Sequence, residues 1–255
     1  MKKLIPLLLT VLSLSAQATV SIISDLDDTI KITNAADIKE ATINGFFTAS
    51  IYSGMDVFLQ ESEKFEPKVL HVVSAAPTFL KPRVKSILHK YQIPFQSVTV
   101  RNVLKENVEV YKLRVIRELI NASSDNFILL GDDVDHDPQI YDEIKKAFPD
   151  RISGVYIHVV KGKELPSTST AYFTTFDLAL KERLAGRLSY ESVAKVAEKI
   201  LSQPKFQRII PGFAVCPTDA SAWSWQQSTE AAELAKKISD NIVSSCRGRK
   251  GKGAE

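Results

Sequence analysis

Five short apolar runs, rich in β-branched residues, most constrain how this chain can fold. They cover residues 20–24, 69–73, 97–100, 127–130 and 155–160. Stretches with the periodicity of amphipathic helices separate them, and continuous apolar strands separated by helices are typical of a parallel sheet covered on both faces. We therefore predict a Rossmann-like α/β fold of three layers with a mainly parallel sheet.

The expected helices fall into two groups along the chain. The first group alternates with the strands and covers residues 55–65, 78–91, 108–121 and a segment that Pro138 opens in its first turn. The second group covers residues 176–186, 189–203 and 228–244. Because the strand pattern stops near residue 165, we expect a core at residues 19–164 and a helical C-terminal extension at residues 165–246 that packs on it.

Residues 1–18 have the pattern of a secretory signal peptide. Lys2 and Lys3 precede an apolar run at residues 4–14, and Ala-Gln-Ala at residues 16–18 supplies the small residues of a cleavage site. The alternatives are an apolar strand or helix, or a membrane anchor, although the run is shorter than the roughly 20 residues that span a bilayer. We expect export through a cleaved signal peptide, to the periplasm or out of the cell.

The net charge of +3 comes from the two ends of the chain. Residues 247–255 carry four basic residues and one acidic residue, and we expect them to form a basic disordered tail. Without residues 1–18 and 247–255 the chain has 27 basic and 29 acidic residues. A slightly acidic body gives no reason to expect specific nucleic-acid binding.

Two cysteines, Cys216 and Cys246, are the sole sulfhydryl residues of the chain. In an oxidising compartment they could form a disulfide that holds the C-terminal region, and two free thiols are the alternative. Without histidines at matching spacing they do not form a zinc site.

Polar residues follow three of the predicted strands directly. The strands end in SDLDDTIK (residues 24–31), VVSAAP (72–77) and LLGDDVDHDP (129–138). Ligands of parallel α/β sheets bind at the carboxyl ends of the strands. Two acidic clusters that meet there repel each other unless a divalent cation neutralises them, and oxygen ligands suit Mg²⁺. A carboxylate beside such a cation can attack phosphorus.

Each of these residues also has a plainer structural interpretation. An aspartate at a strand end is often a turn residue or a helix cap, and Ser74 could be one too. Lys112 alone would be a solvated helix residue. His71 and His158 lie inside apolar strands and are expected in the core or on the sheet face, whereas His136 lies among the aspartates.

Together with Lys112, the three strand-end segments resemble, in order and spacing, the four motifs of the haloacid-dehalogenase-like (HAD) phosphohydrolases. More narrowly, residues 20–160 resemble the catalytic domain of the actin-patch-associated (APP) type of phosphatidate phosphatase. The resemblance implies a HAD-like fold. Only 48 residues separate Asp25 from Ser74, which leaves room for no more than a minimal cap over the site.

The resemblance implies a role for each acidic residue. Asp25 would be the nucleophile and a Mg²⁺ ligand. Asp27 would be the general acid and base, and would also bind the metal through its backbone carbonyl. Asp132 would complete the metal site, and Asp133 and Asp137 would be supporting acidic residues. This chain departs from the family pattern at Asp133, where a serine is usual.

The resemblance also implies a phosphate-binding set. Thr29, Ser74 and Ala75 would contact the phosphoryl oxygens. Lys112 would bind the phosphate too and, as a catalytic residue, offset charge on the nucleophile. His158 stands where the family commonly has an arginine. Cations and hydrogen-bond donors around a transferred phosphoryl group stabilise its transition state.

These observations favour an exported Mg²⁺-dependent phosphatase that uses an aspartyl-phosphate, acting on phosphatidate or a related lipid phosphate. Its partners would be a phosphomonoester substrate, with a phospholipid and contact with a membrane surface as further expectations. The alternatives are a phosphatase of small phosphomonoesters or phosphoproteins, and a catalytically idle HAD-fold binding or effector protein. The sequence leaves the oligomeric state open.

Overall fold

The computed structural model describes most of the chain, namely residues 19–34, 49–65, 69–217, 232–247 and 249. The predicted signal peptide at residues 1–18 and nearly all of the predicted basic tail lie outside these residues. No helix within the described ranges is long and apolar enough to cross a membrane.

The centre of the molecule is a sheet of six parallel strands in the order β3-β2-β1-β4-β5-β6. The strands are β1 (Val20–Ser24), β2 (Leu70–Pro77), β3 (Ser97–Arg101), β4 (Asn126–Asp132), β5 (Ile152–His158) and β6 (Thr170–Tyr172). The central strand β1 pairs on both sides, with Ile22 opposite Leu70 of β2 and Ile128 of β4. The predicted parallel α/β sheet is confirmed, and β6 is a further strand that the sequence pattern did not indicate.

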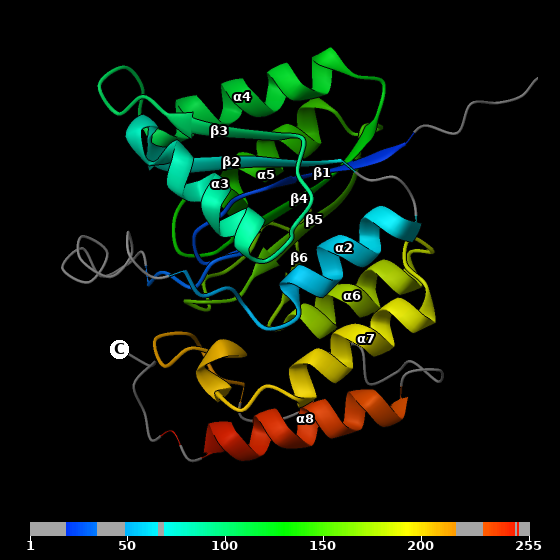
Figure 1. Ribbon diagram of the computed structural model, residues 1–255. Coiled ribbons are helices and arrows are strands. Elements are labelled where there is room, and N and C mark those ends of the chain that lie inside the picture. Colours follow the sequence, from blue (N-terminus) through cyan, green and yellow to red (C-terminus); the bar gives the residue numbers. More distant parts are fainter. Residues whose placement is uncertain (1–18, 35–48, 66–68, 218–231, 248, 250–255) are drawn as a thin grey trace, which may run out of the picture.

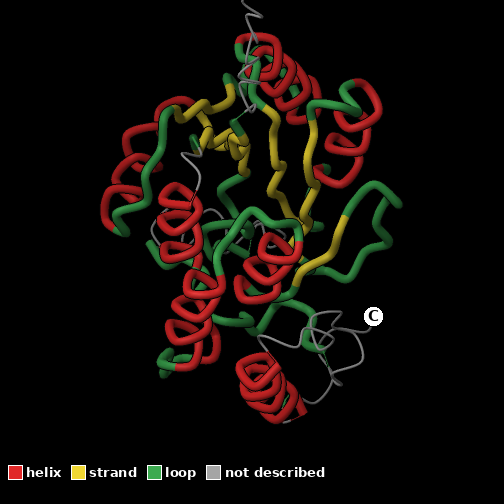
Figure 2. The backbone as a smooth tube through the Cα atoms, turned by 90° about the vertical axis from the view of Figure 1, so that its right-hand side faces the viewer, coloured by secondary structure: helices red, strands yellow, loops and turns green. Residues whose placement is uncertain are grey.

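Helices cover both faces of the sheet (Figures 1 and 2). One face packs against α2 (Met55–Phe65), α3 (Lys81–Lys90), α6 (Thr175–Leu184) and α7 (Tyr190–Leu201). The other face packs against α4 (Val108–Ala122) and α5 (Asp137–Ala147). The last helix, α8 (Ala232–Arg247), lies on the outer side of α7. The result is the three-layer HAD-like arrangement expected from the sequence.

Side-chain caps explain where several helices begin. The side chain of Asn107 accepts a hydrogen bond from Val110 N at the start of α4, and that of Ser189 accepts one from Ser192 N at the start of α7. Such caps satisfy backbone N–H groups that have no partner in the first turn. Along α7, Val193, Val196 and Ile200 recur at helical spacing and are buried, so the apolar stripe of this helix faces the core.

The C-terminal helices share their core with the sheet. Buried side chains of β2, α7 and α8, such as Val72, Val196 and Ile238, belong to one continuous hydrophobic cluster. A disulfide joins Cys216 to Cys246 at the end of α8, with 5.6 Å between their Cα atoms. Of the two alternatives for the cysteines, the structure has the disulfide, which restrains a loop of about 30 residues and contributes roughly 3–4 kcal/mol on the chain-entropy account.

Candidate active site

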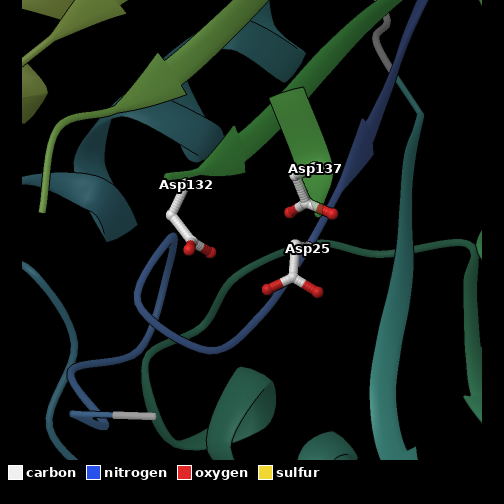
Figure 3. Close-up of side chains that lie close together, drawn as sticks. All are labelled: Asp25, Asp132 and Asp137. Atoms are coloured by element: carbon white, nitrogen blue, oxygen red, sulfur yellow. The ribbon is translucent and has the colours of Figure 1, made fainter. Parts of the chain in front are cut away.

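Three aspartates converge at the carboxyl end of the central strands (Figure 3). Asp25 follows β1, Asp132 ends β4 and Asp137 begins α5. Each offers an oxygen atom, and these atoms all lie within 4.8 Å of one another. All three side chains are buried. The pairing of β1 with β4 brings them together, because Asp25 N extends the ladder by donating to Leu130 O at 2.9 Å.

Lys112 reaches this acidic cluster from α4. Its Nζ lies 2.8 Å from Asp25 Oδ1 and 2.5 Å from Asp137 Oδ1. The ammonium is as buried as the carboxylates. One positive charge therefore faces three carboxylates in a site from which water is largely excluded, and electrostatic repulsion among the aspartates is strong there.

Burial is the main cause of the shifted pKa values of the three aspartates. Burial, with further contributions from Asp137 and Asp27, raises the pKa of Asp25 to about 7 despite the attraction of Lys112. Burial and the repulsion of Asp137 and Asp25 raise the pKa of Asp132 well above its usual value, and burial raises that of Asp137. Burial alone would lower the pKa of Lys112, but its carboxylate neighbours raise it well above its usual value.

Asp27 lies beside the cluster, on a turn that its neighbours hold closed. Its Oδ1 accepts hydrogen bonds from Lys31 Nζ at 2.9 Å and from the Thr33 hydroxyl at 2.6 Å. The turn passes through Asp28, which has a φ of 57° and whose Oδ1 accepts from the backbone of Thr33 and Asn34. Asp27 is partly exposed and faces the cavity described below, so it is accessible to a bound molecule.

The residues expected to bind phosphate have different surroundings. Thr29 is fully buried, and its hydroxyl donates to Asp132 Oδ2 at 3.2 Å, which orients that carboxylate. Ser74 is also fully buried, and its Oγ accepts from Ala76 N at 3.2 Å. Ala75 and Ala76 line the cavity directly. Thr29 and Ser74 thus do not line the cavity themselves but form hydrogen bonds to Asp132 and Ala76, which do.

Asp133 has a different position from its neighbour Asp132. Its carboxylate accepts backbone hydrogen bonds from Val160 and Lys161, both at 2.7 Å, and from Lys163 at 3.0 Å. It is buried and closes the loop that follows β5. The structure therefore gives Asp133 a loop-holding position outside the acidic cluster, while Asp137, grouped with it in the sequence analysis, belongs to the cluster.

His158, at the end of β5, links that strand to the turn around Asp28. Its Nδ1 lies 2.8 Å from Asp28 O, and its ring stacks on Tyr172 and meets the edge of Tyr52. Burial lowers the pKa of His158, which favours the neutral imidazole at pH 7. His158, at the position that carries an arginine in the family pattern, is thus a buried side chain that connects β5 to the turn around Asp28. Its burial agrees with its expected place in an apolar strand.

A cavity of about 390 Å³ opens beside the acidic cluster. One wall is polar and includes Asp25, Asp27, Lys112 and Asp132. A second, apolar part of the lining comes from the end of β2, the short turn that follows it and α3, and it includes Pro77, Leu80, Val84 and Ile87. Two arginines, Arg83 and Arg101, also line the cavity.

Sequence reasoning missed these two arginines and the apolar wall. The only available signal was position in the chain, because Arg101 ends the third strand and Arg83 lies six residues beyond the end of the second. Arg101 is held in place by hydrogen bonds from its guanidinium to the backbone oxygens of Ala75, at 3.3 Å, and Glu106, at 3.0 Å.

The acidic cluster fits a bound metal ion. All of its donors are carboxylate oxygens, which suit hard divalent cations. Asp137 Oδ2 is buried and has no hydrogen-bond partner among the described residues. A cation at Asp25, Asp132 and Asp137 would satisfy this oxygen and stabilise the ionised carboxylates, whose pKa values burial raises.

A curated relative of this chain is longer than the region that it shares with it. An uncharacterized protein of Schizosaccharomyces pombe is 29% identical over 153 residues, which cover 55% of this chain and 25% of that protein. The chain thus spans about a quarter of this relative.

Two solved structures align with the chain at low similarity. A chain in the structure of a Pnkp1/Rnl/Hen1 complex aligns at a TM-score of 0.42 and 16% identity, over 62% of this chain and 47% of the other. A chain in the structure of the Pnkp1/Rnl/Hen1 RNA repair complex aligns at a TM-score of 0.40 and 18% identity, over 66% and 49%. We draw nothing from likeness at this level.

One family model matches the part of the chain that carries the site. It is the model of the phosphatidate phosphatase APP1 catalytic domain, and it matches residues 20–159, more than half of the chain. The match runs from β1 through the end of β5 and includes the acidic cluster and Lys112. It confirms the resemblance that the motifs indicated. The chain belongs to the phosphatidate phosphatase APP1 catalytic-domain family, a family of phosphatases.

Proposed function

We propose that this protein is a Mg²⁺-dependent phosphatase that hydrolyses phosphomonoesters through an aspartyl-phosphate on Asp25, with a lipid phosphate such as phosphatidate as its substrate. The observation that carries the proposal is the acidic cluster of Asp25, Asp132 and Asp137. It is buried, short of positive charge and open to a cavity of about 390 Å³. Sites of this kind attract a cation and a phosphoryl group together.

In the first step, a carboxylate oxygen of Asp25 forms a bond to phosphorus while the bond from phosphorus to the alcohol oxygen breaks. Asp27, partly exposed beside the cavity, donates the proton that the departing alcohol takes up. In the second step, Asp27 takes a proton from water, whose oxygen attacks phosphorus and releases phosphate and the Asp25 carboxylate. Lys112 holds Asp25 in place throughout, at 2.8 Å.

Mg²⁺, held by Asp25, Asp132 and Asp137 or the backbone of Asp27, would supply positive charge for the phosphoryl oxygens. Thr29 would keep the Asp132 carboxylate oriented toward it through its hydrogen bond. Hydrogen-bonded partners of metal ligands of this kind commonly affect both metal affinity and activity.

The two-sided cavity supports a lipid substrate. A phosphoryl group at the polar wall places its alcohol against Pro77, Leu80, Val84 and Ile87. Apolar surface of this kind stabilises hydrocarbon by removing it from water. The membrane contact that such a substrate requires forms part of this proposal.

One observation favours a second candidate, a phosphatase of small phosphomonoesters. Arg83 and Arg101 line the same cavity, and guanidinium groups bind carboxylates and phosphates well. A compact substrate with a second anionic group would place that group near these arginines. An idle binding protein is disfavoured, because Asp25 and Asp27, the nucleophile and the general acid of this proposal, are both present.

We also propose that the protein is exported and acts in the periplasm or outside the cell. The disulfide between Cys216 and Cys246 supports this location, since disulfides persist in oxidising compartments. Recovery of the protein from such a compartment with an N-terminus near Thr19 would bear this out. An intact Met1 in that fraction would contradict cleavage.

The decisive assay compares phosphatidate in detergent micelles with a soluble aryl phosphate, each with Mg²⁺ and with chelator. We expect hydrolysis of both substrates with Mg²⁺ and loss of both with chelator. Asp25→Asn should lower kcat by about 10⁴-fold. The matched control is Asp240→Asn, an exposed aspartate on α8, which should leave kcat unchanged.

Three outcomes would revise the proposal. Equal rates for Asp25→Asn and the unmodified protein would remove Asp25 as nucleophile. Full activity in chelator would remove the metal. Hydrolysis of the aryl phosphate without any hydrolysis of phosphatidate would remove the lipid substrate and favour the second candidate.

A further inference from the structure

Large apolar side chains are exposed at two neighbouring points on the cavity side of the molecule. Phe79 lies in η2 (Thr78–Leu80), the short helix between β2 and α3, and is 74% exposed. Val103 and Leu104 lie in the loop after β3 and are 46% and 93% exposed. These three residues are called the apolar tips below. Contiguous apolar patches on a protein surface commonly mark an interaction site, whereas single exposed apolar residues do not.

The sheet places the apolar tips side by side. Pro77 of β2 pairs with Arg101 of β3, so the chain leaves both strands at the same level. Phe79 follows two residues after Pro77, and Leu104 three residues after Arg101. Figure 1 shows the start of α3 and the loop between β3 and α4 together at the same end of the sheet, and η2 contacts β3.

The apolar tips lie next in the chain to residues that line the cavity. Pro77, Leu80 and Arg101, their neighbours in the chain, line that cavity. The tips themselves are not part of its lining, so they are free to contact something that lies across the opening.

The surroundings of the apolar tips are strongly basic. Residues 78–105 contain six lysines and arginines and no aspartate or glutamate. Among them, Lys81 and Arg83 at the start of α3 and Lys105 next to Leu104 are exposed. In a chain with nearly balanced charge, this segment forms a local surplus of positive charge around the tips.

We propose that the apolar tips and the basic residues Lys81, Arg83 and Lys105 dock the protein on a bilayer that contains anionic lipid. Phe79, Val103 and Leu104 insert at the boundary between headgroups and acyl chains, and the basic residues contact the anionic headgroups. This surface rests on the proposed function, because it turns the mouth of the cavity toward a membrane in which a lipid phosphate lies.

A bilayer fits these observations better than a nucleic acid does. A phosphate backbone would use the basic residues but would leave the aliphatic Val103 and Leu104 in water. In a membrane interface the apolar and basic groups both find favourable surroundings, since binding there combines buried apolar area with attraction to anionic lipid.

The test measures binding of the full chain to phosphatidylcholine vesicles with and without phosphatidylserine, a lipid without a phosphomonoester. We expect binding to the vesicles that contain phosphatidylserine. The double variant Phe79→Ser/Leu104→Ser should lower the partition coefficient by about tenfold or more. The double variant Lys81→Gln/Lys105→Gln should lower it by about fivefold for each charge removed.

The matched control is Leu184→Ser on α6, which replaces another exposed leucine, 67% exposed, and should bind as the unmodified protein does. Circular dichroism of each variant checks folding. Equal binding of Phe79→Ser/Leu104→Ser and the unmodified protein would overturn the proposal. So would an equal loss in Leu184→Ser, or retention of the unmodified protein on single-stranded RNA but not on vesicles.

Hydrolysis of the soluble aryl phosphate separates this proposal from the proposed function. Phe79→Ser/Leu104→Ser should hydrolyse it at the unmodified rate, because the tips do not line the cavity. An unmodified protein that binds vesicles through the tips but hydrolyses nothing would contradict the phosphatase and retain the docking surface. An unmodified protein that hydrolyses the aryl phosphate without binding vesicles would contradict the docking surface and retain the phosphatase.

Discussion

Two buried carboxylate sites in this protein pair with lysines in opposite ways. Glu61 of α2 is met by Lys195 of α7 at 2.9 Å, by Lys64 at 2.9 Å and by the Ser192 hydroxyl at 3.0 Å. In the acidic cluster, by contrast, Lys112 is the one cation among the described residues that pairs with Asp25 and Asp137, and Asp132 beside them has no ion pair there. The Glu61 site has more positive than negative charge, whereas the acidic cluster has less positive than negative charge.

The pKa values follow this difference. Burial alone would raise the pKa of Glu61, but hydrogen bonds from Lys195, Lys64 and Ser192 lower it to about 2. Burial raises the pKa of Asp25 to about 7. A satisfied carboxylate of the first kind stabilises the fold, whereas an unsatisfied cluster in a cavity indicates a site that a cation and a substrate complete.

The largest expected effect comes from Lys112→Gln. This change leaves Asp25 and Asp137 buried without their cation, and breaking a buried pair in this way costs about 3–5 kcal/mol of the free energy of unfolding. We expect that loss in urea unfolding with chelator present. Saturating Mg²⁺ should recover part of it, and no recovery would show that the cluster does not bind the cation.

Glu61→Gln should have a smaller effect. We expect a loss of about 1–2 kcal/mol at pH 7, because Lys64 and Lys195 are more than half exposed and solvent screens them. Phosphatase activity in Mg²⁺ should stay unchanged, since α2 does not reach the acidic cluster. An activity loss as large as that of Asp25→Asn would break the distinction between the two sites.

The stability effect of Glu61 should also depend on pH. Its folded pKa of about 2 lies below its ordinary value of 4.5, so its contribution is complete above pH 4.5 and is lost as the pH falls toward 2. The difference between the unmodified protein and Glu61→Gln should therefore shrink over this range. Urea unfolding at pH 7 and at pH 3 measures it, and a constant difference would contradict the assigned pKa.

The smallest effect is expected for Asp25→Asn in chelator. A carboxyl whose pKa is raised in the folded protein opposes folding when ionised, so a neutral amide should keep or increase stability at pH 7, by about 1 kcal/mol. Mg²⁺ should reverse the order by stabilising the unmodified protein more. A large loss of stability in chelator would mean that Asp25 is satisfied like Glu61.

Much of this site could be predicted from the sequence, because parallel strands bring their carboxyl ends to one edge. Asp25 and Asp132 could be placed together for that reason, and the spacing of the family motifs added Lys112. The position of Asp133 outside the acidic cluster, and that of Asp137 within it, could not be predicted. The position of Asp133 depends on the loop after β5, whose backbone N–H groups hold its carboxylate.

Other features depend on contacts that the sequence pattern does not express. With three residues, β6 is too short to show a period, and it becomes a strand by pairing with β5. The apolar wall of the cavity could not be distinguished from the core of α3, because Val84 and Ile87 serve both. The pairing of Cys216 with Cys246 required the position of α8.

Calorimetric titration of the full chain with Mg²⁺ tests the central claim most directly. We expect one Mg²⁺ to bind to the unmodified protein and to Glu61→Gln with equal affinity. Asp132→Asn, which removes a carboxylate from the acidic cluster, should weaken binding by at least about tenfold. Equal Mg²⁺ affinity in Asp132→Asn and the unmodified protein, or the absence of binding to either, would contradict the assignment of the acidic cluster as the metal site.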